Sequence, residues 1–338
     1  MFPGTPLSLF RPEASSVCKE KEENFVIEVN NLVKRYGDHT AVDHLSFKIE
    51  KGKIYGFLGP NGAGKSTTMN MITGYIASTE GTVTIDGHDI LEEPEQAKKC
   101  IGYLPEIPPL YFDMTVLEYM NFAADLKKIP KNEKKSMVEE VMEMVKISDM
   151  RNRLIKNLSK GYRQRVGLAQ AILGYPEVII LDEPTVGLDP KQIIEIRTLI
   201  KQLGEDHTVL ISSHILSEIG AVCDHVVIIN KGHLVVSDST ENLEKLFKGQ
   251  DILCLSAQGE LEKIQNILRE FPALSIADMK EAEEAETYRF QLKVQDQADY
   301  RKQLFFRFAE AGIPLLEISR AGMSLEDIFL EITEEGRA

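Results

Sequence analysis

The sequence predicts an α/β main domain whose sheet is covered by helices, followed by a smaller α+β unit. Short Val- and Ile-rich runs alternate with helical stretches, and several of these runs are apolar throughout, which indicates strands buried on both faces. Between Thr115 and Lys156 the strands disappear and helical periodicity replaces them, so a helical insertion of about 45 residues is expected. After Ser239 a second pattern begins.

The length of 338 residues suits one large domain with a smaller one, or two domains of ordinary size. We predict a flexible N-terminal arm at 1–24, a main domain at 25–239 with a helical subdomain at about 107–170, and a C-terminal accessory domain at 240–338. The arm lacks a continuous apolar core and contains prolines, so it does not fit a signal peptide.

The elements of the main domain follow in order. Its predicted strands are 25–29, 53–59, 81–85, 177–183, 207–213, 225–230 and 232–239. The helical insertion holds two predicted helices, at 115–128 and 132–147.

The C-terminal unit has the order β, α, β, β, α, β. These elements are predicted at 251–257, 260–271, 274–280, 287–294, 297–312 and 313–319, with a last helix at 324–335. This is the order of a ferredoxin-like split βαβ unit. We expect a regulatory or dimer-stabilising module, with a passive extension as the alternative.

Composition excludes several classes of protein. The net charge of −14 and pI near 5.1 disfavour a protein that holds nucleic acid or anionic lipid by bulk electrostatics. The four cysteines are far apart in the sequence, which predicts reduced thiols in a cytosolic protein: Cys18, Cys100, Cys223 and Cys254. No apolar stretch approaches the roughly 18 to 20 residues that span a bilayer, so the chain is not expected to cross a membrane by itself.

The stretch "GPNGAGKST" has the spacing of a phosphate-binding P-loop, and it stands between a predicted strand and a predicted helix. Glycines let backbone N–H groups approach phosphate oxygens, and the helix N-terminus favours the same anion. Lys65 is expected to reach the outer phosphates of the nucleotide and Ser66 to offer its hydroxyl to Mg²⁺. The candidate nucleotide-binding residues here are Gly59, Pro60, Asn61, Gly62, Ala63, Gly64, Lys65, Ser66 and Thr67.

Two other predicted strands end in polar residues that suit the same chemistry. The run "EVIILDEP" ends in Asp182, which suits a Mg²⁺ contact, and Glu183, which suits polarising the attacking water. His214 ends "VLISSH" and is expected to contact the γ-phosphate. Without the P-loop, a solvated strand end or a structural histidine would explain these residues equally well.

The segment "NLSKGYRQRVGLAQA" begins like a helix capped by Ser159, yet Lys160, Arg163 and Arg165 crowd its first turns. A helix N-terminus disfavours positive charge, so this arrangement indicates that something negative is bound there.

Together these motifs resemble those of ATP-binding cassette (ABC) ATPases. The resemblance rests on Tyr36 before Gly37, "GPNGAGKST", "LSKGYRQR", "IILDEP", "VGLD" and "SSH", in that order, and covers about Phe25 to Ser239. "GYLPE" and the C-terminal "SLEDIFLEIT" are similar to the ATPase subunits of bacterial type-2 exporters, including the drug-export and gliding-motility branches.

The resemblance implies a role for each matching residue. Tyr36 would stack on adenine and Asp182 would hold Mg²⁺. Glu183 would be the catalytic base, with His214 at the γ-phosphate. Asp189 would end the loop that couples two sites. Each of two assignments has an alternative. Tyr36 could simply be an exposed tyrosine at a strand end, and the signature segment (residues 158–165) could be an ordinary capped helix.

In the family, the signature segment of one subunit closes over the ATP held by another. Ser159 and Gly161 would therefore bind nucleotide across a dimer interface. The sequence departs from the usual signature at Lys160 and Tyr162, where glycine and glutamine are common. It also has Glu106 where the family has a glutamine. A glutamate there is either a charged Mg²⁺ ligand or a solvated loop residue.

The resemblance implies an ATP-hydrolysing subunit with ATP and Mg²⁺ as cofactors, forming a homodimer, or a heterodimer with a related ATPase, when ATP is bound. Integral-membrane permease subunits would carry out the transport. They would dock on a surface near Tyr111, Phe112 and Met114, unless these three are core residues. The expected location is the cytoplasmic face of the inner or plasma membrane.

The alternative is a soluble ABC ATPase that acts on ribosomes or DNA. The negative net charge of the chain disfavours it, and we expect no nucleic-acid partner. A small-molecule P-loop kinase would not need the signature segment.

Overall fold

A computed structural model describes residues 25–247, 251–282, 284–296 and 298–322. The predicted arm at 1–24 and the helix predicted at 324–335 lie outside these residues.

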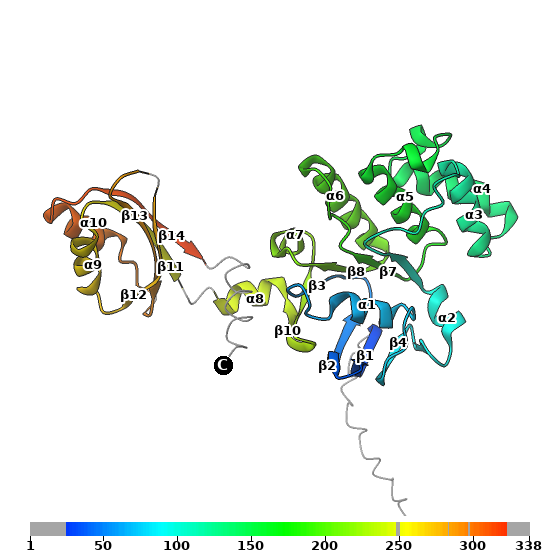
Figure 1. The fold of residues 1–338 in the computed structure, drawn as a ribbon, viewed down its shortest axis with the longest axis horizontal. Coiled ribbons are helices and arrows are strands. Elements are labelled where there is room, and N and C mark those ends of the chain that lie inside the picture. Colours follow the sequence, from blue (N-terminus) through cyan, green and yellow to red (C-terminus); the bar gives the residue numbers. More distant parts are fainter. Residues whose placement is uncertain (1–24, 248–250, 283, 297, 323–338) are drawn as a thin grey trace, which may run out of the picture.

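A six-stranded sheet in the order β10-β9-β3-β8-β7-β6 forms the centre of the main domain (Figure 1). Every pair within it is parallel except β9 and β10, which are antiparallel. Its strands are β3 (Ile54–Leu58), β6 (Ile101–Leu104), β7 (Val178–Asp182), β8 (Thr208–Ser213), β9 (His225–Asn230) and β10 (His233–Ser239). The predicted α/β class is confirmed, and β6 is a strand that the sequence analysis missed.

Strand β7 shows why the prediction of strands buried on both faces was correct. Ile179 and Leu181 enter one hydrophobic core, whereas Val178 and Ile180 enter another. Successive side chains of a strand point to opposite faces, so only an apolar run can fill both cores.

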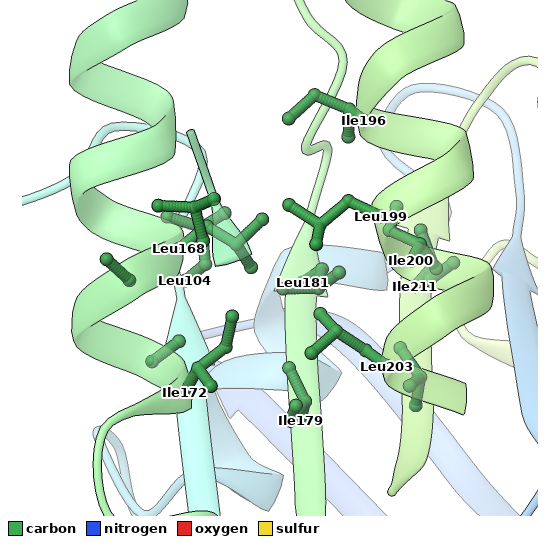
Figure 2. Packing of buried hydrophobic residues seen from close by; sticks show 14 of the residues in the cluster. Leu104, Leu168, Ile172, Ile179, Leu181, Ile196, Leu199, Ile200, Leu203 and Ile211 are labelled. Atoms are coloured by element: carbon green, nitrogen blue, oxygen red, sulfur yellow. The ribbon is translucent and has the colours of Figure 1, made fainter. Parts of the chain in front are cut away.

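The first of these cores lies under two helices, α5 (Lys160–Ile172) and α6 (Pro190–Asp206). Figure 2 shows Leu168 and Ile172 of α5, and Leu199 and Leu203 of α6, directed towards the strands between them. Gly102 lets α5 approach β6 closely, because a Cβ on it would lie 2.2 Å from the carbonyl oxygen of Ala171.

The second core joins the central sheet to helix α1 (Lys65–Ile72) and to an antiparallel sheet in the order β2-β1-β4-β5. Figure 1 shows β1, β2 and β4 on the side of the central sheet opposite α5 and α6. The strands of this second sheet are β1 (Phe25–Tyr36), β2 (His39–Glu50), β4 (Glu80–Ile85) and β5 (His88–Asp89).

The predicted helical insertion is present. It contains α3 (Val116–Leu126) and α4 (Lys131–Met144), followed by two 3₁₀ turns, η1 (Ser148–Met150) and η2 (Ile155–Asn157). Helix α3 begins with a reciprocal capping box between Thr115 and Glu118, which satisfies two backbone N–H groups at its start. Two shorter helices, α2 (Pro94–Lys99) and α7 (Leu216–Gly220), complete this domain.

The C-terminal unit is a four-stranded antiparallel sheet in the order β12-β13-β11-β14, with its own hydrophobic core formed with two helices. Its elements are β11 (Asp251–Gln258), α9 (Leu261–Arg269), β12 (Leu274–Glu281), β13 (Thr287–Val294), α10 (Arg301–Glu310) and β14 (Leu315–Gly322). This strand order agrees with the ferredoxin-like topology predicted from the sequence.

Helix α8 (Thr240–Phe247) stands between the two units, and the sequence analysis assigned it to the second. Its Leu243 is buried in the main domain's core. We therefore propose that the main domain extends to Phe247, while the other predicted boundaries stay predictions.

Candidate functional site

The stretch Gly59–Thr67 links the end of β3 to the start of α1, as the sequence predicted. Gly64 has a φ of +101°, and a Cβ on it would lie 2.6 Å from the carbonyl oxygen of Ala41. A side chain at this position would therefore be strained and would also strike the backbone of β2. The glycine lets the loop lie close against the β1–β2 hairpin, which carries Tyr36.

Lys65 is folded over its own loop. It is 7% exposed, and its Nζ donates hydrogen bonds to the carbonyl oxygens of Gly59 at 2.8 Å and Pro60 at 3.4 Å. Burial lowers the pKa of Lys65, although the carboxylates of Glu183 and Asp182 oppose that effect. A cation is thus held where the loop would receive an anion.

Asp182 ends β7 and Glu183 follows it, and both side chains are buried. Burial raises the pKa of Asp182, the hydroxyl of Ser212 lowers it by hydrogen bonding, and the negative charge of Glu106 raises it further. Glu183 Oε1 lies 3.8 Å from Lys65 Nζ. The carboxyl ends of parallel strands thus bring these groups to one edge of the sheet.

His214 follows β8 at the same edge. Its Nδ1 lies 3.0 Å from both carboxylate oxygens of Glu183, and its side chain is 41% exposed. The structure therefore brings Lys65, Glu183 and His214 together from three separate stretches of sequence.

The donors predicted for Mg²⁺ were Ser66, Asp182 and Glu106. Their hydroxyl and carboxylate oxygens are the ligand types that this hard cation prefers. The negative charge of Glu106 raises the pKa of Asp182, and a bound cation would relieve this repulsion. In the described parts of the chain, no three His, Cys, Asp or Glu side chains form a metal site of their own. Phosphate oxygens and water would have to complete the coordination shell.

Tyr36 ends β1, and 51% of its surface is exposed. Lys34 Nζ lies 5.3 Å from the centre of its ring, which is within the range of a cation–π contact. The exposed ring suits stacking on a base. An exposed tyrosine at a strand end would look the same, so the predicted adenine contact remains a prediction.

Ser159, Gly161 and Asp189 form a second cluster. Ser159 caps α5 by accepting a hydrogen bond from the Tyr162 N–H at 3.4 Å, and Asp189 caps α6 by accepting one from Gln192 at 2.9 Å. Gly161 and Asp189 line one cavity of about 570 Å³. Among the described residues, no hydrogen bond or ion pair joins this cluster to Gly59–Thr67.

The three basic residues in this segment have different surroundings. Arg165 is buried, pairs with Glu195 of α6 and donates to the carbonyl oxygen of Val145. Arg163 donates to the carbonyl oxygens of Ile155 and Lys156 and lies over the ring of Phe112. Both arginines are thus explained by contacts within the chain.

Lys160 lies over Gly187, since a Cβ on that glycine would come within 2.1 Å of Lys160 Nζ. The residues "SKG" and "VGLD" are therefore next to each other in the folded chain, although more than 20 residues separate them in the sequence.

Sequence reasoning missed two residues that organise the site. Ser212 is fully buried and bonds to both Asp182 and Glu183. Glu218 of α7 accepts hydrogen bonds from Thr185 Oγ1 at 2.5 Å and Ser213 Oγ at 3.4 Å, so it links the segments that follow β7 and β8. Neither residue belongs to a motif with its own spacing, although Ser212 lies within "SSH".

Comparisons with known proteins agree with this geometry. A family model described as "ABC transporter" matches residues 42–186. The bacitracin transport ATP-binding protein BcrA of Bacillus licheniformis is 35% identical over 317 residues, which cover 92% of this chain and 98% of that protein. The linearmycin resistance ATP-binding protein LnrL of Bacillus subtilis (strain 168) is 32% identical over 313 residues, covering 91% of this chain and 98% of that protein.

Among solved structures, an ATP-binding cassette captured as a dimer in a post-hydrolysis state with ADP and Pi is similar to this chain. The TM-score is 0.58 and the identity 25%, with 63% of this chain and 98% of that chain covered.

Proposed function

This chain belongs to the ABC transporter family of ATPases, and we propose that it powers an exporter through separate membrane subunits by ATP-driven dimerisation. It binds ATP and hydrolyses it to ADP and phosphate, as its family does. The observation that carries the proposal is the convergence of Lys65, Glu183 and His214 at one edge of the sheet.

Each residue at this edge has an assigned task. Lys65 binds the outer phosphates of ATP after exchanging its bonds to the loop carbonyls for bonds to phosphate oxygens. Glu183 accepts a proton from the attacking water as the bond between the γ-phosphorus and the bridging oxygen breaks and ADP leaves. His214, which lies against Glu183, orients that carboxylate and contacts the γ-phosphate. Tyr36 stacks on the adenine.

We assign Mg²⁺ to Ser66, Asp182 and Glu106, together with the phosphates of ATP. When bound, the ion neutralises charge on the β- and γ-phosphates. A glutamate at 106 adds a negative charge that the usual glutamine lacks, and this strengthens the electrostatic attraction for the cation.

We assign Ser159, Gly161 and Asp189 to the dimer interface, where they meet nucleotide held by a second subunit. The support is that these residues cluster at two adjacent helix starts, outside the network around Lys65 of their own chain. A helix start with free backbone N–H groups attracts anions. The partner is a second copy of this chain or a related ATPase.

A cavity of about 500 Å³ is the proposed contact surface for a permease. Its lining includes Tyr75 and Ile107, which are 79% and 82% exposed, together with Pro109 and with Pro105, which precedes Glu106 in the sequence. Exposed apolar side chains around a concave surface fit an inserted helix of a partner.

The residues suggested from sequence for this contact differ among themselves. Met114 packs against the buried core, whereas Tyr111 and Phe112 are 55% and 47% exposed. Tyr111 and Phe112 are not among the residues that line this cavity, so their contact with a permease stays a prediction.

The names of the relatives, which refer to bacitracin transport and linearmycin resistance, support export as the direction. They do not favour the alternative of an ABC ATPase acting on ribosomes or DNA. No helix in the described parts of the chain is long and apolar enough to cross a bilayer. We place the protein on the cytoplasmic face of the membrane, held there by permease subunits.

Copurification tests this proposal. The tagged chain, produced together with the membrane proteins encoded by neighbouring reading frames, should be recovered from detergent extracts in a stable complex with one of them. Ile107→Asp should reduce that recovery, whereas Leu316→Asp, at another exposed apolar residue in the C-terminal unit, should not. Recovery of the chain without any multi-spanning partner would contradict the transport function. ATPase activity stimulated by nucleic acid would favour the alternative.

A further inference from the structure

We propose that Ser212 is a positioning residue that holds Glu183 in the geometry needed for hydrolysis. This inference rests on the proposed role of Glu183 as the catalytic base. It gives a role to a serine of "SSH", a motif in which only His214 was assigned chemistry.

Ser212 lies on β8 directly opposite Asp182 in the parallel pairing of β7 and β8. Its side chain is fully buried. The Ser212 hydroxyl donates a hydrogen bond to Asp182 Oδ1 and accepts one from the Glu183 N–H at 3.0 Å. The backbone carbonyl oxygen of Ser212 accepts a second bond from the same N–H, at 3.2 Å. One serine therefore contacts both acidic residues that follow the strand.

The chemistry of a hydroxyl explains this double contact. A serine hydroxyl has one proton to donate and two lone pairs to accept with. Its proton is directed to the Asp182 carboxylate, which fixes the rotation of the O–H bond. A lone pair then faces the N–H of Glu183. Alanine would remove both bonds at once and leave the Glu183 N–H with the carbonyl oxygen alone.

Glu183 needs such a restraint because its backbone has a φ of +48°, in the left-handed region. A residue with a Cβ adopts this conformation only when its surroundings enforce it, and such residues concentrate at functional sites. The conformation directs the carboxylate towards His214 Nδ1 at 3.0 Å and Lys65 Nζ at 3.8 Å. Without the Ser212 hydroxyl the peptide can relax, and the carboxylate moves with it.

The test compares two serine or threonine hydroxyls on the same strand. Thr208 also lies on β8, is 1% exposed, and accepts a hydrogen bond from the Gly52 N–H at 2.9 Å through its Oγ1. Ser212→Ala and Thr208→Ala thus each delete a buried acceptor of a backbone N–H. Only the first of these acceptors touches the site.

For Ser212→Ala we expect kcat to fall about 10- to 100-fold, because a misplacement of about 1 Å can cost that much. The KM for ATP should change by less than about threefold, because Lys65 and the loop are untouched. Thr208→Ala should keep kcat within about twofold of the parent, even if its thermal midpoint falls by as much as that of Ser212→Ala. Ser212→Cys, which keeps a side chain of similar size with a weaker donor and acceptor, should have a kcat between those of the parent and Ser212→Ala.

A double-mutant cycle separates positioning of Glu183 from a general structural role. In a Glu183→Gln chain the base is gone, so adding Ser212→Ala should change the residual rate by less than about twofold. Nucleotide binding, followed by equilibrium titration, should be the same in all variants.

Two results would overturn the inference. One is an unchanged kcat in Ser212→Ala, and the other is an equally large loss when Ser212→Ala is added to Glu183→Gln. Hydrolysis at the parent rate by Glu183→Gln alone would instead refute the role of Glu183, and the inference would fail with it.

Discussion

Gly161→Ala should leave the folded monomer almost unchanged and strongly weaken ATP-driven dimerisation. Gly161 is buried at the start of α5, against the Gln192 side chain of α6. Both residues line the cavity that also contains Asp189. The substitution therefore acts at the surface that we assign to the second subunit.

The structure allows the size of each effect to be worked out. The new methyl carbon would lie 2.6 Å from Gln192 Oε1, 2.7 Å from Cδ and 2.8 Å from Nε2. Ordinary contacts are about 3.5 Å, so this amide must move by roughly 1 Å. Because the amide is the end of a flexible side chain, that movement costs little, and replacing glycine in a helix gains up to about 1 kcal/mol. The free energy of unfolding should thus change by less than about 1 kcal/mol.

Dimerisation should respond differently, because the displaced amide and the methyl group change the shape of a surface that must fit closely around a nucleotide. We expect the dissociation constant of the ATP-bound dimer to rise about 100-fold, which corresponds to about 2.7 kcal/mol. That is within the usual cost of overfilling a closely fitted space.

The assay is sedimentation velocity in a Glu183→Gln background, with ATP and with ADP, alongside urea unfolding of the monomer. Gly204→Ala is the matched control. It is also a helical glycine, and its Cβ would meet only the side chain of Ile54, at 2.5 Å. Gly204→Ala should dimerise like the parent. Equal dimerisation by Gly161→Ala, or a loss of more than about 2 kcal/mol in its unfolding free energy, would refute the reasoning.

Four further predictions concern the site and the fold. Glu183→Gln should bind ATP normally and accumulate as an ATP-bound dimer in size-exclusion chromatography, and hydrolysis at the parent rate would show that it is not the base. Ser159→Arg should retain ATP binding by the monomer and lose both dimerisation and hydrolysis, whereas an active variant would remove the segment from the interface. Gly102→Ala should destabilise the chain by about 2 kcal/mol in urea unfolding, because its Cβ meets backbone of α5 at 2.2 Å, and an unchanged midpoint would contradict that close approach. A chain ending at Phe247 should bind ATP like the full chain but differ in dimer lifetime or in control of transport, and identical behaviour in both would leave the C-terminal unit as a passive extension.

The apolar strands of the central sheet could be predicted because their hydrophobicity does not depend on context, whereas the 12-residue strand β2 was missed. Strand β7 is apolar over its whole length up to Asp182, and the groups that follow it were predicted from their position at its carboxyl end. Strand β6 was missed because its four residues include Gly102, which weakens any strand signal but is needed for the approach of α5.

The residues of the site were predictable where a motif fixes their spacing, as for Lys65 and Glu183. Ser212 was not, because its role depends on the register between β7 and β8, and a single sequence does not specify which strands become neighbours. The contact between Lys160 and Gly187 is a similar case. It arises from the packing of two helix starts that no local pattern connects.

The folded-back Lys65 has a consequence for how ligands compete at the phosphate loop. Since its ammonium group already has two carbonyl partners, an incoming anion gains only the difference between the new contacts and those given up. A lone orthophosphate offers few other contacts to make up that difference, whereas a nucleotide also has its other phosphates and its base. The two carbonyl contacts of Lys65 should therefore compete more effectively with inorganic phosphate than with a nucleotide.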